Sequence, residues 1–301
     1  MKPTLSIVFF TVFSGAGLGL ATALAIFTPD LSRVTFTWAA GMAAVLTGGG
    51  LAASTGHLAN PKNAWRAVFR VRTSWLSREA VLAIIFFPLL GLWVWLRDTE
   101  WDGWGWRLAV ALCALLTVKC TAMIYQSLKP IAAWHHPLTS INYLLLSLLS
   151  GSFLFAVFAA MDGGLHMSAI WATAFFALLA TLGKMAHYRR IGKAEDIRVG
   201  HAVGFTQAKA RLLDAGHTGP TFLTREFIFE APAARLRLFR RLSLLLMILS
   251  PLLGAALMFG GGAIMGAVLV IPMFVGLLIE RWLFFAEAKH VVRLYHGKGK
   301  A

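Results

Sequence analysis

Two ionisable side chains near the ends of apolar segments could carry out proton chemistry. His57 ends one apolar run, and Glu79 begins the next. A neutral imidazole can hydrogen-bond to a quinone carbonyl and can relay a proton near neutral pH. Glu79 could be its proton partner across the interface. Simpler roles are also open: a histidine bonded to a loop carbonyl, and a glutamate in a first helical turn that Ser77 caps, where its charge suits the helix dipole.

A lysine lies inside a later apolar run. Lys119 is the kind of ionisable group within a membrane helix that suggests function. The polar residues Tyr125 and Gln126 follow it in the same run. Its long stem could instead carry the ammonium group to the interface about two turns away. Both readings stay open at this stage.

The histidines offer little for a bound metal. His135 and His136 are adjacent, so on a helix they would point in different directions and make a poor pair of ligands. A b-type haem would take axial histidines from two spans. His57 and His187 lie near span ends on the same face and are the conceivable pair.

The cysteines exclude one redox centre. Cys113 and Cys120 lie in one apolar run, and their spacing on a helix is too long for a disulfide. An iron–sulfur cluster needs about four cysteine ligands, so this protein alone cannot hold one. We interpret both as packing residues and predict no metal site. The sequence also lacks a phosphate-binding loop, a nucleotide fingerprint, a zinc signature and a nucleophile elbow, so we predict no catalytic residue.

Composition identifies the elements that must position these groups. Of the 301 residues, 58% are hydrophobic and 14% charged, whereas soluble domains carry about 25% charged residues. A membrane span needs about 20 mostly apolar residues. We predict an all-α integral membrane protein, a single domain over 1–301. Its predicted spans are 5–27, 35–57, 79–96, 106–126, 139–160, 165–186, 242–260 and 264–285. Glycines at 15, 17, 19 and 48–50 predict close helix packing.

Charge sets the predicted orientation. With eight spans, 24 of the 28 lysines and arginines lie on the face that holds both termini, and Arg33, Arg97 and Arg107 lie on the other. The positive-inside rule places the basic face and both termini in the cytoplasm, so we expect a multi-pass protein of the inner membrane. The basic face could bind lipid headgroups or an acidic partner protein, and topology explains the charge without nucleic acid. The expected aromatic belt at the opposite interface comprises Trp93, Trp95, Trp101, Trp104 and Trp106.

A loop at about 187–240 is predicted as a docking surface. It has about 50 residues, far more than joining two helices requires. It contains Arg225 and Glu226 beside Phe222, Phe227 and Phe229, and these aromatic rings would be exposed if the protein stood alone. An aromatic patch rimmed by charge is typical of a partner interface. The segment could instead fold back on the bundle or lie along the membrane surface.

Two motifs resemble one family of membrane subunits. The first is His57-Leu58-x-x-Pro61-x-x-Ala64-Trp65, followed by Ser74-x-Leu76-Ser77-Arg78-Glu79. The second is Met123-Ile124-Tyr125-x-x-x-Lys129-Pro130-Ile131-x-x-Trp134-His135-x-Pro137-Leu138, with Asn142-Tyr143. Together with eight spans, they resemble the membrane anchor subunits of dimethyl sulfoxide reductase-type molybdoenzymes. The similarity is greatest to anchors of sulfite dehydrogenase.

The resemblance implies a complex of three subunits in which this one binds a quinone, either ubiquinone or menaquinone. Molybdopterin and iron–sulfur clusters would lie only in the catalytic and electron-transfer partners, and the family's anchors typically lack haem. The resemblance implicates His57 and Glu79 at the quinone site. We add nearby polar residues as candidates: Ser54, Arg78, Lys119 and Tyr125.

The predicted orientation in the membrane favours one of the activities that the family resemblance leaves open. A cytoplasmic docking face fits sulfite oxidation, in which electrons flow into quinone, because the respiratory dimethyl sulfoxide reductases are exported. An anchor of a dimethyl sulfoxide or related reductase is the alternative within the family. A small transporter is the alternative of another class, although we find no internal repeat of the kind transporters often show.

Overall fold

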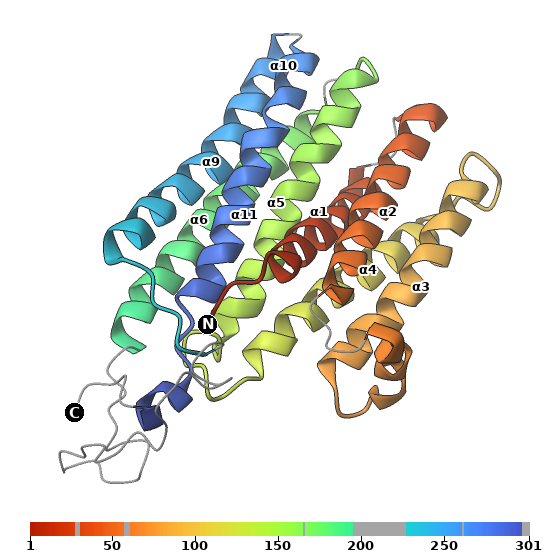
Figure 1. Ribbon diagram of the computed structural model, residues 1–301. Coiled ribbons are helices and arrows are strands. Elements are labelled where there is room, and N and C mark those ends of the chain that lie inside the picture. Colours follow the sequence, from red (N-terminus) through yellow and green to blue (C-terminus); the bar gives the residue numbers. More distant parts are fainter. Residues whose placement is uncertain (28–30, 57–60, 165, 195–226, 261, 297–301) are drawn as a thin grey trace.

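The computed structural model describes residues 1–27, 31–56, 61–164, 166–194, 227–260 and 262–296, and within these ranges it is all-helical. The α-helices are α1 (Leu5–Phe27), α2 (Arg33–Thr55), α3 (Trp75–Leu96), α4 (Trp104–Gln126), α5 (Pro137–Met161), α6 (Met167–Ala194), α9 (Ala233–Phe259), the short α10 (Ala263–Val268) and α11 (Val270–Ala286) (Figure 1). Two short 3-10 helices, η2 (Pro61–Arg70) and η3 (Val291–His296), lie at one end of the bundle.

Eight helical segments of the described residues are long and apolar enough to cross a membrane, which confirms the predicted number. Two of them run further than predicted. α6 continues to Ala194 and α9 begins at Ala233, so the connection between them is shorter than the predicted 187–240. The added turns carry arginines, among them Arg190 and Arg235. Charged turns of this kind suit the polar interface beyond the hydrocarbon.

The last span is interrupted near its middle. α10 and α11 together form the span Ala263–Ala286, and Leu269 separates them with ψ −6°, far from the helical value of about −42°. Pro272 has no N–H to donate to the carbonyl of Val268, the residue that ends α10. The turn at Leu269 is therefore free to tighten.

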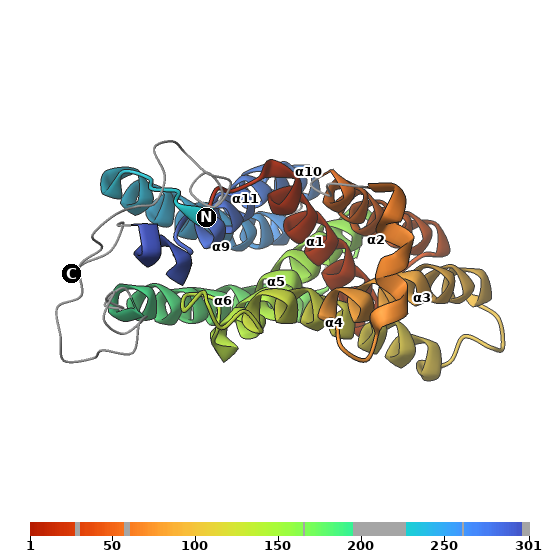
Figure 2. The same cartoon turned by 60° about the horizontal axis from the view of Figure 1, so that its bottom comes forward.

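The helices stand in two rows that face each other, as Figure 2 shows. One row contains α9, α11, α1 and α2, and the other contains α6, α5, α4 and α3. α1 and α5 lie at the centre and are the most enclosed of the spans. Large apolar side chains such as Ile84, Leu112 and Phe175 point outward, as expected for surfaces that face lipid.

Small residues allow the two rows to touch. A Cβ added at Gly19 of α1 would overlap the Ser147 carbonyl, and one added at Gly151 of α5 would overlap the backbone of Gly19. The backbones of α1 and α5 are therefore in direct contact, in the manner of small-residue crossings in membranes. The prediction that these glycines serve packing is confirmed at Gly17, Gly19 and Gly50, whereas Gly15 has open space around it.

The two ends of the described residues lie at the same end of the bundle. The Met1 ammonium group donates to the Ala288 carbonyl at 2.6 Å, just beyond the end of α11. An even number of spans requires this arrangement. The compartment on that side stays a prediction.

The aromatic belt was predicted correctly in part. Trp95, Trp101 and Trp104 are exposed, but Trp93 is fully buried, so the prediction was wrong for Trp93. Its indole N–H donates to Asp102 at 3.3 Å, and its ring meets that of Phe36 edge-on. Trp93 therefore faces α2 and the core, while Trp95 lies on the outer face of α3. Both cysteines are buried and free, consistent with packing roles.

Candidate functional site

Glu79 lies in the first turns of α3 but is not a surface charge. Its side chain is 3% exposed, and it accepts a hydrogen bond from the Thr121 hydroxyl of α4. Ser74 caps the helix by accepting from the Ser77 amide, so the expectation that Ser77 is the cap was wrong. A carboxyl this deep in a membrane helix is costly and suggests a function.

The predicted proton partner of Glu79 lies outside the described residues. His57 directly follows Gly56, which caps the end of α2 and is the last residue described there. That His57 faces Glu79 stays a prediction. Ser54, in the last turn of α2, is half-buried and donates to the Leu51 carbonyl at 2.6 Å.

Arg78 closes the turn that leads into α3. Its guanidinium donates to the carbonyls of Val71 and Arg72, both at 2.8 Å, and lies over the Trp75 ring at 4.1 Å. These contacts fix the start of the helix that carries Glu79. Any contact of Arg78 with a ligand would add to this structural role.

The two α4 candidates have different surroundings. Lys119 is half-buried, and it makes no ion pair with the residues that the structure describes. Tyr125 is buried in an aromatic cluster, with ring centroids 5.2 Å from Trp134 and 5.8 Å from Tyr143. Thr121 is the α4 residue that reaches Glu79. It was not predicted, because threonine is common in membrane helices and its position alone gives no signal.

A buried charged cluster was missed entirely. Lys184 Nζ of α6 lies 2.5 Å from Glu280 Oε1 of α11, and Arg281 Nε lies 2.5 Å from Glu280 Oε2. Arg281 Nη2 also donates to Glu280 Oε1 at 2.8 Å. All three side chains are buried. In the predicted topology Lys184 and Arg281 were counted among the charges of the basic face, although Glu280 and Arg281 fall inside the predicted span 264–285.

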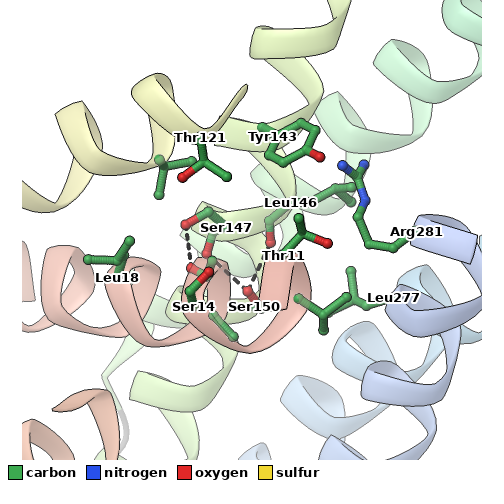
Figure 3. Close-up of a pocket in the computed structure, with 14 residues that line it drawn as sticks. Thr11, Ser14, Leu18, Thr121, Tyr143, Leu146, Ser147, Ser150, Leu277 and Arg281 are labelled. Atoms are coloured by element: carbon green, nitrogen blue, oxygen red, sulfur yellow. Dashed lines mark hydrogen bonds between the residues drawn. The ribbon is translucent and has the colours of Figure 1, made fainter. Parts of the chain in front are cut away.

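A small cavity, lined by both polar and apolar residues and named here the polar cavity for its hydroxyl groups, lies between the two rows next to this cluster (Figure 3). Its volume is about 30 Å³, enough for one or two water molecules. Tyr143 and Arg281 line it, and their side chains point toward each other. Within the described residues, Tyr143 Oη and Arg281 Nη1 are buried without a hydrogen-bond partner. The remaining polar lining comes from Thr11, Ser14, Thr121, Ser147 and Ser150.

That this protein holds no metal site and no haem stays a prediction. Among the described residues, no three histidine, cysteine or acidic side chains come together as a metal site. His187 is buried, and its ring stacks near Phe284 with centroids 6.3 Å apart. His57, the residue considered with it as a pair of haem ligands, lies outside the described residues.

The predicted docking residues are only partly described. Arg225 and Glu226 lie outside the described residues. Phe227 and Phe229 are half-buried: Phe227 lies 4.8 Å from the His290 ring, and Phe229 lies 6.2 Å from Trp282. The expectation that these two rings are exposed was wrong, because they pack on the end of α11 and the segment after it. Their docking role stays a prediction.

The sequence matches the family described as "DMSO reductase anchor subunit (DmsC)" over residues 1–286. The protein belongs to this anchor family. The C subunit of sulfite dehydrogenase from Allochromatium vinosum is 33% identical over 322 aligned positions, which cover 98% of this protein and 99% of that relative. Two anaerobic dimethyl sulfoxide reductase proteins are similar over shorter stretches. YnfH of Escherichia coli is 32% identical over 37% of this protein and 40% of its own length, and the Haemophilus influenzae relative is 31% identical over 49% and 55%.

Membership in the anchor family agrees with the eight spans. The protein is a multi-pass membrane protein of the DmsC family. The resemblance found in the two motifs of 57–79 and 123–143 is confirmed, and it extends over nearly the whole sequence.

Proposed function

We propose that this protein is the quinone-binding anchor of a three-subunit molybdopterin oxidoreductase. It passes electrons between a partner iron–sulfur subunit and the quinone pool during cytoplasmic sulfite oxidation. The observation that carries the proposal is the full-length similarity to a sulfite dehydrogenase subunit, whereas the matches to the dimethyl sulfoxide reductase proteins are partial.

The position of Glu79 supports a quinone site at the end of the bundle that holds the N-terminus. Its carboxyl is buried, and the hydrogen bond that it accepts from Thr121 comes from a neutral hydroxyl and not from a cation. Such a group can take up or give a proton at a ligand oxygen. A bound quinone supplies the two-electron chemistry. The protein positions the ring, excludes water and exchanges protons at the two ring oxygens.

The quinone cannot occupy the polar cavity between the rows. A space of about 30 Å³ holds water and not a substituted ring. We place the ring instead on the side of α3 that contacts η2 and α2. This placement is consistent with the first of the two family motifs.

Charge supports the orientation and the partners. The end of the bundle that carries Met1 and η2 is the basic face, with 24 of the 28 lysines and arginines in the predicted topology. The structure buries two of these, Lys184 and Arg281, which leaves the imbalance intact. An iron–sulfur subunit with an acidic surface would dock on this face, and the molybdopterin subunit would bind to it in turn.

Quinone-coupled turnover of the assembled complex tests the site. We expect His57→Leu and Glu79→Gln to lower it by about 100-fold or more, because each removes a proton-exchanging group. Sulfite oxidation with a soluble dye as acceptor should be unchanged. Asp98→Asn, a matched loss of a carboxylate at the opposite end, should leave both activities intact. Wild-type quinone turnover in both test variants would refute the assignment.

Co-purification tests the assembly. In mild detergent, molybdenum and iron should follow the tagged anchor through purification. A protein that purifies alone and transports a solute in vesicles would favour the transporter alternative. Reporter fusions at the C-terminus should be active in the cytoplasm, and activity on the other side would favour an exported reductase.

A further inference from the structure

The quinone proposal leaves the Lys184–Glu280–Arg281 cluster without a role. Isolated charges inside a bilayer are costly, and replacing a buried ion pair by apolar residues is often neutral or stabilising. One carboxylate here faces two cations, and Arg281 Nη1 makes no hydrogen bond of standard geometry to the described residues, although the Arg281 guanidinium lies over the Tyr143 ring at 4.2 Å. Stability alone does not explain such an arrangement.

The polar cavity connects this cluster to Glu79. Thr121 Oγ1 donates to Glu79 and lines the cavity on the side of α4. Arg281 and Tyr143 line it on the side of α11 and α5. Arg281 holds Glu280 through two hydrogen bonds. The cavity therefore borders Thr121, which binds Glu79, and Arg281, which binds Glu280.

Water is the ligand that this cavity fits. Buried water typically makes about three hydrogen bonds to polar groups that lack other partners. Tyr143 Oη and Arg281 Nη1 are two such groups, and the hydroxyl of Thr121 lies on the opposite wall. The hydroxyls of Ser14 and Ser150 already donate to carbonyls of their own helices, so their oxygens can accept.

The cluster also leads toward the basic end of the bundle. Lys184 Nζ lies 4.8 Å from the Tyr188 ring, and Arg240 lies over the same ring at 5.0 Å. Arg240 Nε is 2.5 Å from Glu287 Oε1, and the Arg240 side chain is 32% exposed. Polar groups therefore continue from Glu280 to the interface.

We propose that ordered water in this cavity relays protons to and from Glu79, so that the quinone site exchanges protons with the basic face through the interior of the bundle. This inference rests on the proposed quinone function. For each quinone reduced to quinol, two electrons come from the partner iron–sulfur subunit and two protons come from solvent at that face. Each proton passes through this water and the hydroxyls of Tyr143 and Thr121 to Glu79, which gives it to a ring oxygen, while Glu280 stays a carboxylate between Lys184 and Arg281. Arg281 is a positioning residue that holds the water and Glu280 in place.

Removing single hydroxyls tests the relay with little change in shape. In the assembled complex, Thr121→Val and Tyr143→Phe should each slow quinone reduction and its proton uptake, followed with a pH-indicator dye, by about tenfold or more. The solvent deuterium isotope effect should rise, because proton transfer becomes limiting. Turnover with the soluble dye and the affinity for a quinone-analogue inhibitor should stay at wild-type values.

Thr173→Val is the matched control. Thr173 is a buried threonine of α6 whose hydroxyl donates to Ala169 one turn back, as Thr121 does to Thr117, but it does not line the cavity. It should reduce quinone at the wild-type rate. Wild-type quinone reduction in both test variants would overturn the relay while leaving the quinone function intact. Equal losses with the dye would also overturn it, as a structural defect. A wild-type complex that reduces no quinone would instead refute the proposed function.

Discussion

Two charged networks among the described residues are built differently. At the end away from Met1, Arg97 Nη1 donates to Asp102 at 3.0 Å, and Asp162 accepts from Ser32 and Thr35. These residues lie at helix ends and in the short turns between them. The Lys184–Glu280–Arg281 cluster lies inside two spans, α6 and α11, with all three side chains buried.

The difference separates a structural role from a functional one. The end network joins α2 to α3 and α5, where loops and interfacial water can compensate each charge. The buried cluster has no such compensation, yet it keeps unpaired polar atoms on a cavity. Such a costly arrangement suggests selection for chemistry and not for packing.

The largest expected loss of stability follows from a substitution of Glu280. Glu280→Gln leaves two buried cations without their carboxylate, so we expect a loss of about 3–5 kcal/mol. Thermal unfolding in detergent would measure it. Lys184→Met should cost clearly less, because Glu280 keeps both hydrogen bonds from Arg281. Equal losses in the two variants would mean that Arg281 cannot hold Glu280 alone.

The end network should respond more weakly. Asp102→Asn removes the carboxylate that pairs with Arg97 and accepts from Trp93. We expect a loss of about 1–3 kcal/mol in the same unfolding experiment. Asp98→Asn is the matched control: this aspartate is 51% exposed, and exposed pairs contribute about 0–1 kcal/mol. A loss at Asp102 as large as that at Glu280 would break the contrast between the networks.

A smaller effect on stability is expected when the pH is lowered. Burial raises the pKa of Asp162, but hydrogen bonds from Ser32 and Thr35 outweigh it and hold this pKa below its usual value. The charged form is thus favoured in the folded protein. Its stabilising contribution is present at neutral pH and is lost as pH falls through the lowered pKa. Asp162→Asn should flatten this acid-side fall in melting temperature, and an unchanged pH profile would contradict the assignment.

The smallest effect is expected at a helix cap. Ser32 Oγ accepts from the Thr35 amide at 3.3 Å and donates to Asp162. Ser32→Ala should cost about 1 kcal/mol, measured as a shift in the unfolding midpoint. Thr37→Ala offers a comparison, because its exposed hydroxyl donates only to the carbonyl of Arg33 in its own helix. It should have little effect.

Much of this architecture could be predicted from the sequence, for a physical reason. Hydrocarbon thickness fixes span length, so apolar runs reveal the helices directly. The direction in which a single side chain points cannot be predicted in this way, because it depends on which helices become neighbours. Trp93 and Trp95 are two residues apart in one span, yet one is buried and the other exposed. Lys184 and Glu280 meet only because α6 and α11 pack in facing rows, and no local pattern indicates that.

The glycine contact between α1 and α5 has a consequence for synthesis. Of the eight described spans, α1 leaves the ribosome before the other seven, and it is the most enclosed of them. Its backbone contact with Gly151 cannot form until α5 has entered the membrane, and its contact with α11 must wait longer still. During that interval Gly19 faces lipid or the insertion machinery. A span made first and covered last is a natural point for a membrane insertase to hold the growing polypeptide.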